Sequence, residues 1–315
     1  HRLRAGTAAA KQAEGDAMVF RIGTADTGGT FDTQGMAVAQ VFNESRPPGE
    51  RCELTRSSAS IDNANRLDRG EIEFGFMASN WVPRAGQGTA PFDHPIGLRV
   101  VSPANAGPIF FVALADTPVA NIDDLAGKRV VVGARDSGMT QHVHTLCNAL
   151  GIPFSDFDPV YLGFPEGADA LAAGAVDVQF QCPIPNAVMT DLSRRARVKV
   201  VPYREEQIEQ VLSKVFFYRR VVMRRGVFRG VEEDIPQLAV LNVLVTHERV
   251  DEDLVYELVS TLVANTGALA RLNPLFEGLA DLYEPLRTEG PAALELDGVP
   301  LHPGALRAYR DAGYL

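Results

Sequence analysis

Short segments rich in Gly, Ser and Thr are the parts of this chain whose residue types and spacing point to chemistry. The first, residues 23–30, has the spacing of a phosphate-binding loop, but Gly29 stands where such a loop needs its lysine. The missing lysine argues against a nucleoside triphosphatase. A glycine-rich loop between a strand and a helix still offers backbone N–H groups to an anion.

The sequence contains no constellation typical of covalent catalysis or of a metal site. A nucleophile elbow around Ser137 would need glycine at the two positions held by Arg135 and Met139. His142 and His144 are two residues apart on a predicted helix, so they cannot share a face and bind zinc together. The three cysteines form no C-x-x-C pair, although one disulfide stays open as an alternative. We therefore expect no catalytic residue, no metal and no cofactor.

Four polar segments favour a binding site instead, because each follows a predicted strand. They are residues 24–30, 55–60, 79–80 and 137–140. In an open α/β sheet, ligands bind beyond the carboxyl ends of the strands. One such segment alone is more often a helix cap, but four together favour a site. The last segment also opens a predicted helix, whose N–H groups could hold a carboxylate.

The composition limits the classes of partner. The chain has 315 residues, a formal charge of −10 and 46% hydrophobic residues, which are ordinary values for a globular protein of about two domains. An acidic balance argues against nucleic acid or an anionic membrane surface as the main partner. No run of about 18 apolar residues is present, so the sequence predicts no membrane span.

Strands and helices alternate along most of the chain. The first series comprises predicted strands at Met18–Ile22, Cys52–Thr55 and Ile72–Ala78 and helices at Gly35–Asn43 and Ser60–Gly70. A second series of the same kind runs from residue 121 to residue 180. Each series implies a parallel sheet, so the pattern predicts an α/β protein with two similar lobes.

The remaining segments complete this prediction. Residues 216–223 are apolar and β-branched, which suits a strand that crosses between the lobes. Residues 251–272 carry the longest helical pattern. Residues 1–17 are polar, Ala-rich and aperiodic and show no signal-peptide pattern, so we expect a disordered N-terminal segment.

Five segments in a fixed order carry a family resemblance. They are IGTADTGGTF, LTRSSASIDNANRLDRGEIEFGF, NIDDLAGKRVVVGARDSGMT, GADALAAGAVDVQF and the C-terminal PLHPGALRAYRDAGYL. Over residues 20–315 the chain resembles the TAXI-type solute-binding proteins of TRAP transporters. The third segment occurs widely among binding proteins, whereas its combination with the glycine loop and the HPGA ending is specific.

The resemblance implies a two-lobed, type II periplasmic-binding-protein-like fold, with two parallel or mixed sheets flanked by helices and joined by hinge strands. We place lobe one at residues 18–110 and 224–315 and lobe two at residues 111–223. The resemblance further implies a periplasmic, monomeric protein whose signal peptide has been removed. Such a protein captures a small carboxylate-bearing solute in the cleft between the lobes by hinge closure and delivers it to a TRAP permease. The expected solutes are glutamate-like amino acids, dicarboxylates and keto acids.

The resemblance also implies which residues line the site. From lobe one we expect Thr30, Phe31, Arg56, Ser57, Ser60, Asn63, Ser79 and Asn80. From lobe two we expect Arg135, Ser137, Gly138, Met139, Thr140 and Pro185. Either arginine could bind a carboxylate through two hydrogen bonds, or could be a solvated surface residue.

Two other functions are compatible with the same fold. A ligand-sensing regulatory subunit would need an attached output module. An enzyme would need a nucleophile beside a base, and the sequence shows no such pair. We therefore expect a binding protein rather than an enzyme.

Overall fold

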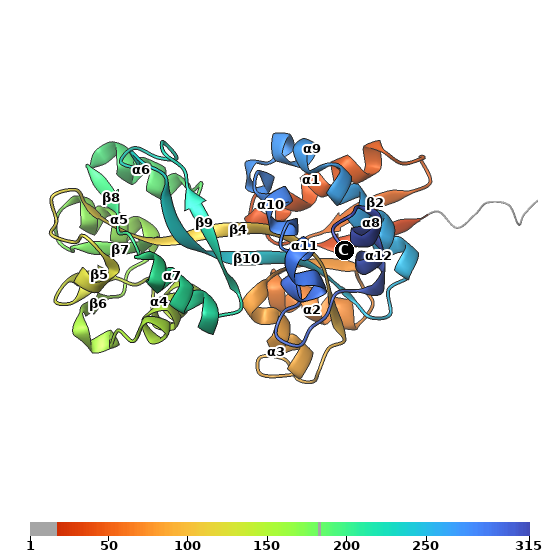
Figure 1. Ribbon diagram of the computed structural model, residues 1–315, viewed down its shortest axis with the longest axis horizontal. Helices are drawn as coiled ribbons and strands as arrows, with labels where there is room; N and C mark the ends of the chain where they lie inside the picture. Colours follow the sequence, from red (N-terminus) through yellow and green to blue (C-terminus); the bar gives the residue numbers. More distant parts are fainter. Residues whose placement is uncertain (1–17, 182–183) are drawn as a thin grey trace, which may run out of the picture. The chain divides into compact units, whose positions relative to one another are not determined.

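The structure, a computed structural model, describes residues 18–181 and 184–315 (Figure 1). The predicted disorder of residues 1–17 and the position of Cys182 lie outside these residues. The chain forms two compact units. Unit 1 comprises the residues up to Asn105 together with Val243–Leu315, and unit 2 comprises Ala106–Asn242.

Unit 1 begins with the predicted alternation of strands and helices. Its N-terminal elements are β1 (Val19–Gly23), α1 (Thr30–Glu44), β2 (Arg51–Thr55), α2 (Ser60–Asp68), β3 (Phe74–Ala78), α3 (Val82–Gln87) and the first part of β4 (Leu98–Leu114). Its C-terminal elements are the end of β10 (Ile235–His247), α8 (Glu252–Ala264), α9 (Thr266–Leu272), α10 (Leu279–Tyr283), α11 (Leu286–Glu289) and α12 (Pro303–Asp311). The strands β2 and β3 both pair in parallel with β1, as predicted.

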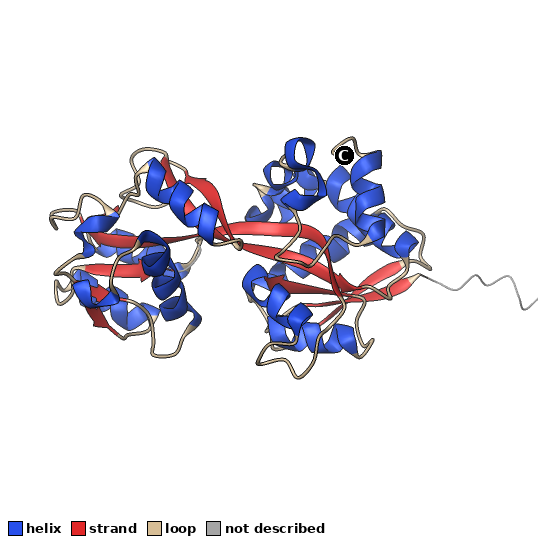
Figure 2. Cartoon of the chain, turned by 60° about the horizontal axis from the view of Figure 1, so that its bottom comes forward, coloured by secondary structure: helices blue, strands red, loops and turns tan. Residues whose placement is uncertain are grey.

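Unit 2 repeats this logic around a second group of parallel strands. Its elements are β5 (Arg129–Val131), α4 (Gly138–Leu150), β6 (Asp158–Val160), α5 (Phe164–Ala172), β7 (Val178–Gln181), α6 (Ala187–Arg195), β8 (Val198–Val200), α7 (Glu205–Lys214) and β9 (Tyr218–Met223). The strands β6 and β7 pair in parallel with β5, whereas β4 runs antiparallel to β7 and β8. In each unit helices cover both faces of the strands (Figure 2). The predicted α/β class, with mixed sheets flanked by helices, is confirmed.

The boundary between the units falls within two long strands, β4 and β10. The prediction that residues 216–223 cross between the lobes is wrong. The strand β9 instead pairs antiparallel with the first half of β10, and both stay within unit 2. A β-branched run is typical of any buried strand, so its composition does not distinguish a hairpin strand from a crossing strand.

Two helix predictions need correction at their ends. The helix α1 begins at Thr30 rather than Gly35, because its first turn, TFDTQ, is mostly polar and hides the apolar period. The single helix predicted over 251–272 is broken at Asn265, which ends α8. The Asn265 side-chain amide donates to the carbonyl of Thr261 at 2.7 Å, and this bond competes with the regular helical pattern.

The HPGA segment fixes the last helix onto unit 1. His302 is buried, its Nδ1 accepts the N–H of Gly304 at 3.1 Å, and its Nε2 lies 2.9 Å from the carbonyl of Val250. Gly304 packs so closely on α8 that a Cβ would lie 2.3 Å from the Glu252 carbonyl. This motif therefore has a packing role in the described structure.

Two further observations concern the whole described chain. Cys52 and Cys147 are buried free thiols, and burial raises their pKa to about 12 and about 11, so neither is a reactive thiolate at neutral pH. In the part of the chain that the structure describes, no helix combines the length and the apolar character that a membrane crossing requires.

The His142 side chain makes the stability of unit 2 depend on pH. Its Nδ1 lies 2.7 Å from the Tyr218 hydroxyl, and burial lowers its pKa from 6.5 to about 4. The unfolded chain therefore binds more protons between pH 6.5 and 4, so stability falls as pH decreases through this window. We expect a loss of about 3 kcal/mol in urea unfolding measured across that range. His142→Gln keeps a hydrogen-bond acceptor and should remove the contribution of His142, whereas His247 and His302, whose pKa burial also lowers, keep theirs. His144→Gln, on the exposed side of α4, should leave it unchanged; the same pH profile in both variants would contradict this account.

Candidate functional site

The lobe-one site residues gather at the carboxyl ends of the parallel strands of unit 1. The loop 24–29 follows β1, the loop 56–59 follows β2, and Ser79 and Asn80 follow β3. Since these strands are neighbours and parallel, their carboxyl ends meet at one edge of the sheet. Eight of the predicted residues are therefore in one region of unit 1.

The side-chain amide of Asn63 holds this region together. Asn63 is 0% exposed, and its Nδ2 donates to the carbonyls of Thr24 and Phe76, each at 2.9 Å, and to that of Gly23 at 3.2 Å. Its Oδ1 accepts the Ser57 hydroxyl at 2.6 Å. Asn63 thus joins the ends of β1 and β3 to the loop after β2. Because its donors are already used, the structure gives Asn63 a positioning role.

Ser57 and Ser60 also direct their hydroxyl groups into the protein. The Ser57 hydroxyl lies 3.0 Å from the Thr24 carbonyl and accepts the Ala59 N–H at 3.1 Å. The Ser60 hydroxyl accepts the Ala78 N–H at 3.0 Å. Between them, Ala59 has a φ of 71°, which a residue with a side chain rarely adopts. Such local strain is found preferentially at functional sites, where the surrounding contacts hold it.

The glycine loop of unit 1 is filled by a carboxylate of the protein itself. The buried Asp32 accepts the Gly28 N–H at 2.9 Å, and its other oxygen lies 3.5 Å from Nε of Arg56. The Arg56 side chain is 62% exposed, so this ion pair is partly solvated. An anion at this loop would therefore meet an internal negative charge, and Arg56 has an internal partner.

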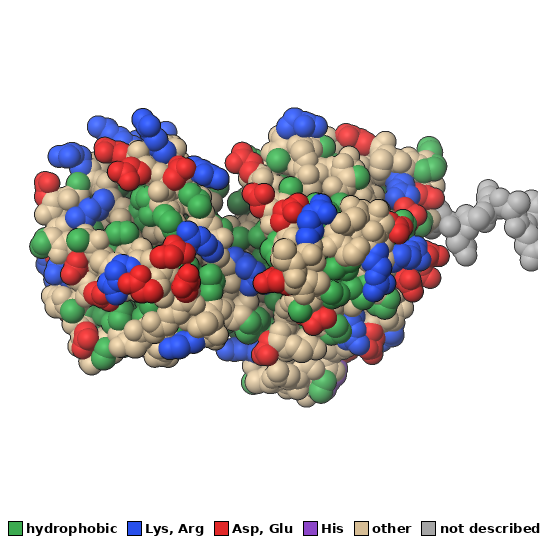
Figure 3. All heavy atoms as spheres, in the orientation of Figure 1, with side chains coloured by type: hydrophobic (Ala, Val, Ile, Leu, Met, Phe, Trp, Pro, Cys, Tyr) green, Lys and Arg blue, Asp and Glu red, His purple; other side chains and the backbone are tan. Residues whose placement is uncertain are grey.

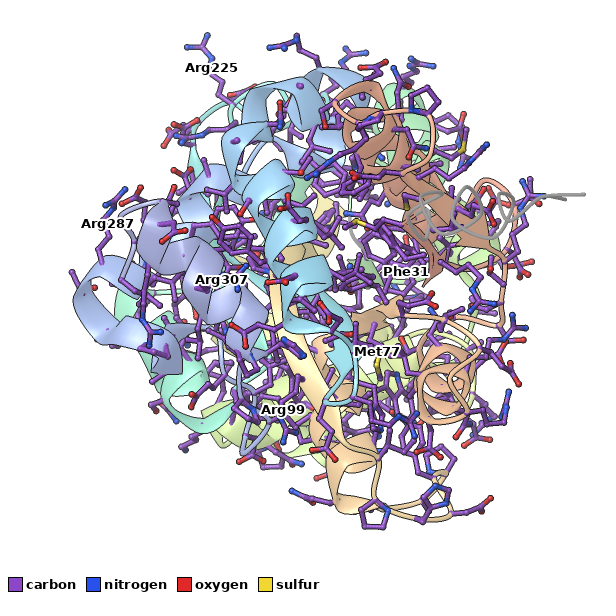
Figure 4. All side chains as sticks on the ribbon, turned by 90° about the vertical axis from the view of Figure 1, so that its right-hand side faces the viewer. Phe31, Met77, Arg99, Arg225, Arg287 and Arg307 are labelled. Atoms are coloured by element: carbon purple, nitrogen blue, oxygen red, sulfur yellow. The ribbon has the colours of Figure 1, made fainter. Side chains whose placement is uncertain are left out.

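The other lobe-one residues differ in exposure. Thr30, the first residue of α1, and Asn80 are at least partly open to solvent, whereas Ser79 is buried. Phe31 is nearly buried and stacks on Phe76 with ring centroids 5.6 Å apart. Figure 4 shows Phe31 and, on β3, Met77. Of this set, Thr30 and Asn80 are the side chains most available to a solute.

The lobe-two residues form the N-terminus of α4 in unit 2. The Ser137 hydroxyl caps the helix by accepting the Thr140 N–H at 3.3 Å, and the Thr140 hydroxyl donates to the Ala134 carbonyl at 2.9 Å. These two hydroxyl groups are therefore used inside the loop. The exposed residue Asp136, with a φ of 57°, makes the turn that leads into the helix.

The first two N–H groups of α4 point to an anion site. Within the described residues, the N–H groups of Gly138 and Met139 have no acceptor. Gly138 is exposed, and a Cβ added to it would contact nothing within 4 Å. Unpaired N–H groups at the positive end of a helix of 13 residues favour a negatively charged group.

Arg135 lies in the same loop and is exposed. Its guanidinium is 4.1 Å from the centre of the Tyr161 ring. This contact restricts the side chain while leaving its N–H groups available, since an arginine stacked on a ring can still bind a carboxylate at its edge. Pro185, the last predicted residue, is exposed and follows β7.

Sequence reasoning missed buried glutamines in both units. In unit 2, Gln179 donates to the Phe164 carbonyl at 3.1 Å and accepts from Gln181 at 2.9 Å, which orients both amides. In unit 1, Gln34 donates to Asn105 at 3.0 Å. The Oε1 atoms of Gln181 and Gln34 are buried and have no partner among the described residues. A glutamine in an otherwise buried apolar run, as in VQFQ, was the available signal.

The described residues show no group of three His, Cys, Asp or Glu side chains that could hold a metal ion. In unit 2 they offer hydrogen-bond donors at the start of α4, a hydrogen-bond acceptor on Gln181 and the exposed guanidinium of Arg135. This set is suited to binding an organic ion through hydrogen bonds.

Comparisons with known proteins identify the fold. A sequence model of the NMT1-like family matches residues 22–313. The periplasmic sulfonate-binding protein SsuA of Methylobacillus flagellatus KT has a TM-score of 0.59 at 13% identity, over 95% of this chain and 96% of that one. A TctC solute-binding protein from Polaromonas has a TM-score of 0.55 at 14% identity, over 84% and 88% of the two chains. An amino-acid ABC transporter extracellular-binding protein, ytmK of Bacillus subtilis, has a TM-score of 0.50 at 14% identity, over 83% and 98%. The predicted periplasmic-binding-protein-like fold is confirmed.

The role of Asn63 in joining β1, β3 and the loop after β2 can be tested by measuring the free energy of unfolding. Asn63→Ala removes the donor from three buried carbonyls, so we expect the free energy of unfolding to fall by about 3 kcal/mol in urea titration. Asn65→Ala, on the same helix and without a side-chain hydrogen bond in the described structure, should change it by less than about 0.5 kcal/mol. Equal unfolding curves for the two variants would contradict the role.

Proposed function

The chain belongs to the NMT1-like family, and we propose that it is a solute-binding protein that captures a small carboxylate-bearing solute. The observation that carries this proposal is the open N-terminus of α4, where two unpaired N–H groups and Arg135 lie in one loop. The protein of similar fold from Methylobacillus flagellatus is named for binding a sulfonate, which is also a small organic anion. The proposed role is binding and release without chemical change.

The charges of the two units favour the carboxylate at unit 2. In unit 1 the glycine loop already holds the Asp32 carboxylate, which would repel a second anion. In unit 2 the loop before α4 offers N–H donors, and its one acidic side chain, Asp136, is exposed. A charged acceptor makes stronger hydrogen bonds to backbone N–H groups than a neutral one does. A carboxylate should therefore displace water from the first N–H groups of α4.

A buried glutamine of unit 2 supports an amino acid rather than a dicarboxylate or keto acid. The amide of Gln181, at the carboxyl end of β7, is oriented by its bond to Gln179 and presents a carbonyl oxygen that lacks a donor. An unpaired buried acceptor costs about 1–3 kcal/mol, which a ligand with an ammonium or hydroxyl group would recover. We propose a glutamate-like amino acid as the preferred class.

The partner and the compartment are proposed from the sequence resemblance. The TAXI-type segments lead us to propose hinge closure on the solute, residence in the periplasm and delivery to a TRAP permease. The fold is shared with proteins named as components of ABC transporters as well, so the type of permease rests on the sequence segments alone.

A thermal-shift screen tests the proposal. Free ligand stabilises the folded state by mass action, so glutamate-like amino acids should raise the melting temperature more than dicarboxylates or keto acids of the same length. If no small organic anion shifts the melting temperature, the proposed function is wrong. A larger shift with dicarboxylates would overturn only the proposed role of Gln181.

Gly138→Ala tests the anion site without disturbing the fold. A Cβ at Gly138 meets no protein atom within 4 Å, but it would crowd an anion on the first N–H groups of α4. We expect the affinity for a glutamate-like amino acid, measured by calorimetry, to fall on the order of tenfold. The melting temperature of the free protein should be unchanged. Gly278→Ala is the matched control, since a Cβ there is also unobstructed and lies far along the chain in unit 1. Equal affinity in both variants would remove the site from α4.

A further inference from the structure

The basic residues of this acidic chain are concentrated in one stretch. Residues 194–229 contain eleven Lys and Arg and only three Asp and Glu, although the chain as a whole has a formal charge of −10. The stretch lies entirely in unit 2 and covers the end of α6, β8, α7, β9 and the turn after β9. A local reversal of charge this large can attract negatively charged partners to that part of the surface.

Most of these cations already have partners within the protein. Arg195 pairs with Asp169 and Asp191, Arg204 with Asp123 and Glu206, Arg220 with Glu205, and Arg224 with Asp234. The Lys199 and Lys214 ammonium groups donate to backbone carbonyls. Four exposed arginines remain whose guanidinium groups have no carboxylate within 4.0 Å among the described residues, namely Arg194, Arg197, Arg225 and Arg229.

These four arginines belong to one surface. Arg194 lies in the last turn of α6 and Arg197 precedes β8, while the other two lie on the turn 224–231. This turn packs directly on β8, since a Cβ at Gly230 would lie 2.4 Å from the Val198 carbonyl. The side chains beneath, Leu192, Val198, Phe228 and Val231, form part of one buried cluster. We call Arg194, Arg197, Arg225 and Arg229 the arginine face.

The arginine face is held rigidly and has an apolar centre. The turn is closed by the Gly226 N–H to the Val231 carbonyl at 2.8 Å and by the Arg225 N–H to Asp234 at 2.9 Å. Val227, between two of the arginines, is 45% exposed. Figure 3 shows Lys and Arg side chains gathered over α6 and the turn after β9, and Figure 4 shows Arg225 extending away from the ribbon. Arginines around an exposed apolar residue are typical of protein interfaces.

The arginine face and the candidate ligand site lie at opposite ends of the parallel strands of unit 2. The strand β4 pairs Ala113 with Val178, the first residue of β7, and Leu114 with Val198, the first residue of β8. The arginine face is therefore near the amino end of β7, whereas Gln181 is at its carboxyl end. A partner bound here would not cover the α4 loop.

We propose that the arginine face docks a protein partner through clustered carboxylates on that partner. Arginine forks pair with carboxylates through two parallel hydrogen bonds. An anionic membrane presents a continuous negative surface, which the exposed Glu232 and Glu233 beside the face would repel. A protein chain can instead place its carboxylates at the arginines alone. This inference does not depend on the identity of the solute.

Binding to a poly-L-glutamate surface tests the inference in solution. The unliganded wild-type protein should bind at low salt and release as salt is added, whereas Arg225→Glu with Arg229→Glu should bind on the order of tenfold more weakly. The matched control is Arg271→Glu with Arg310→Glu, which makes the same charge change at two exposed arginines of unit 1 and should bind like the wild type. Far-UV circular dichroism and melting curves establish that all three proteins are folded.

Three results would overturn the proposal. Equal loss in both double variants would show a response to net charge alone. No binding by the wild type would leave the face without affinity for carboxylates. Binding to phosphatidylserine vesicles but not to poly-L-glutamate would assign the face to a membrane. Because the solute is absent from these measurements, each result is independent of the proposed function.

Discussion

The carboxyl ends of the parallel strands of unit 1 are held together by one buried side chain, the Asn63 amide. Parallel strands bring their carboxyl ends together but leave three loops without regular partners for their carbonyl groups. Asn63 supplies donors to two of these strand ends and receives the Ser57 hydroxyl from the third loop. A network of this kind is stable only when every member is satisfied, and here Asn63 uses its amide fully.

The two units treat their backbone N–H groups differently. In unit 1 the buried Asp32 carboxylate accepts the Gly28 N–H, so an anion at this loop would meet an internal negative charge. In unit 2 Ser137 and Thr140 turn inward to shape the loop, and the N–H groups of Gly138 and Met139 stay unpaired. The same sequence feature, a small polar segment before a helix, therefore carries a buried carboxylate in one unit and only an exposed one in the other. The difference is a single acidic residue placed to reach the loop.

The charged side chains divide in a similar way. Some form ion pairs within the protein, and others are available to a partner. The basic stretch 194–229 would suggest a uniformly positive surface, but ion pairs with distant acidic residues neutralise much of it. What remains is a small group of arginines on a rigid turn. Surface ion pairs contribute little to stability. Their main effect here is to neutralise most of the cations, so that only the unpaired arginines remain available to a partner.

The sequence by itself determined the α/β class, the order of most elements and the loops in which polar side chains concentrate. These follow from local causes: apolar periodicity, glycine loops and the geometry of parallel strands. It could not predict which of those polar side chains face inward. The tertiary structure decided that Asn63, Ser57 and Ser60 bind carbonyl and N–H groups of neighbouring strands, that β9 returns along β10, and that Gln34 and Gln181 are buried. Several of these depend on a hydrogen-bond partner far away in the sequence, such as Thr24 for Asn63 and Asn105 for Gln34, and residue type alone does not specify that partner.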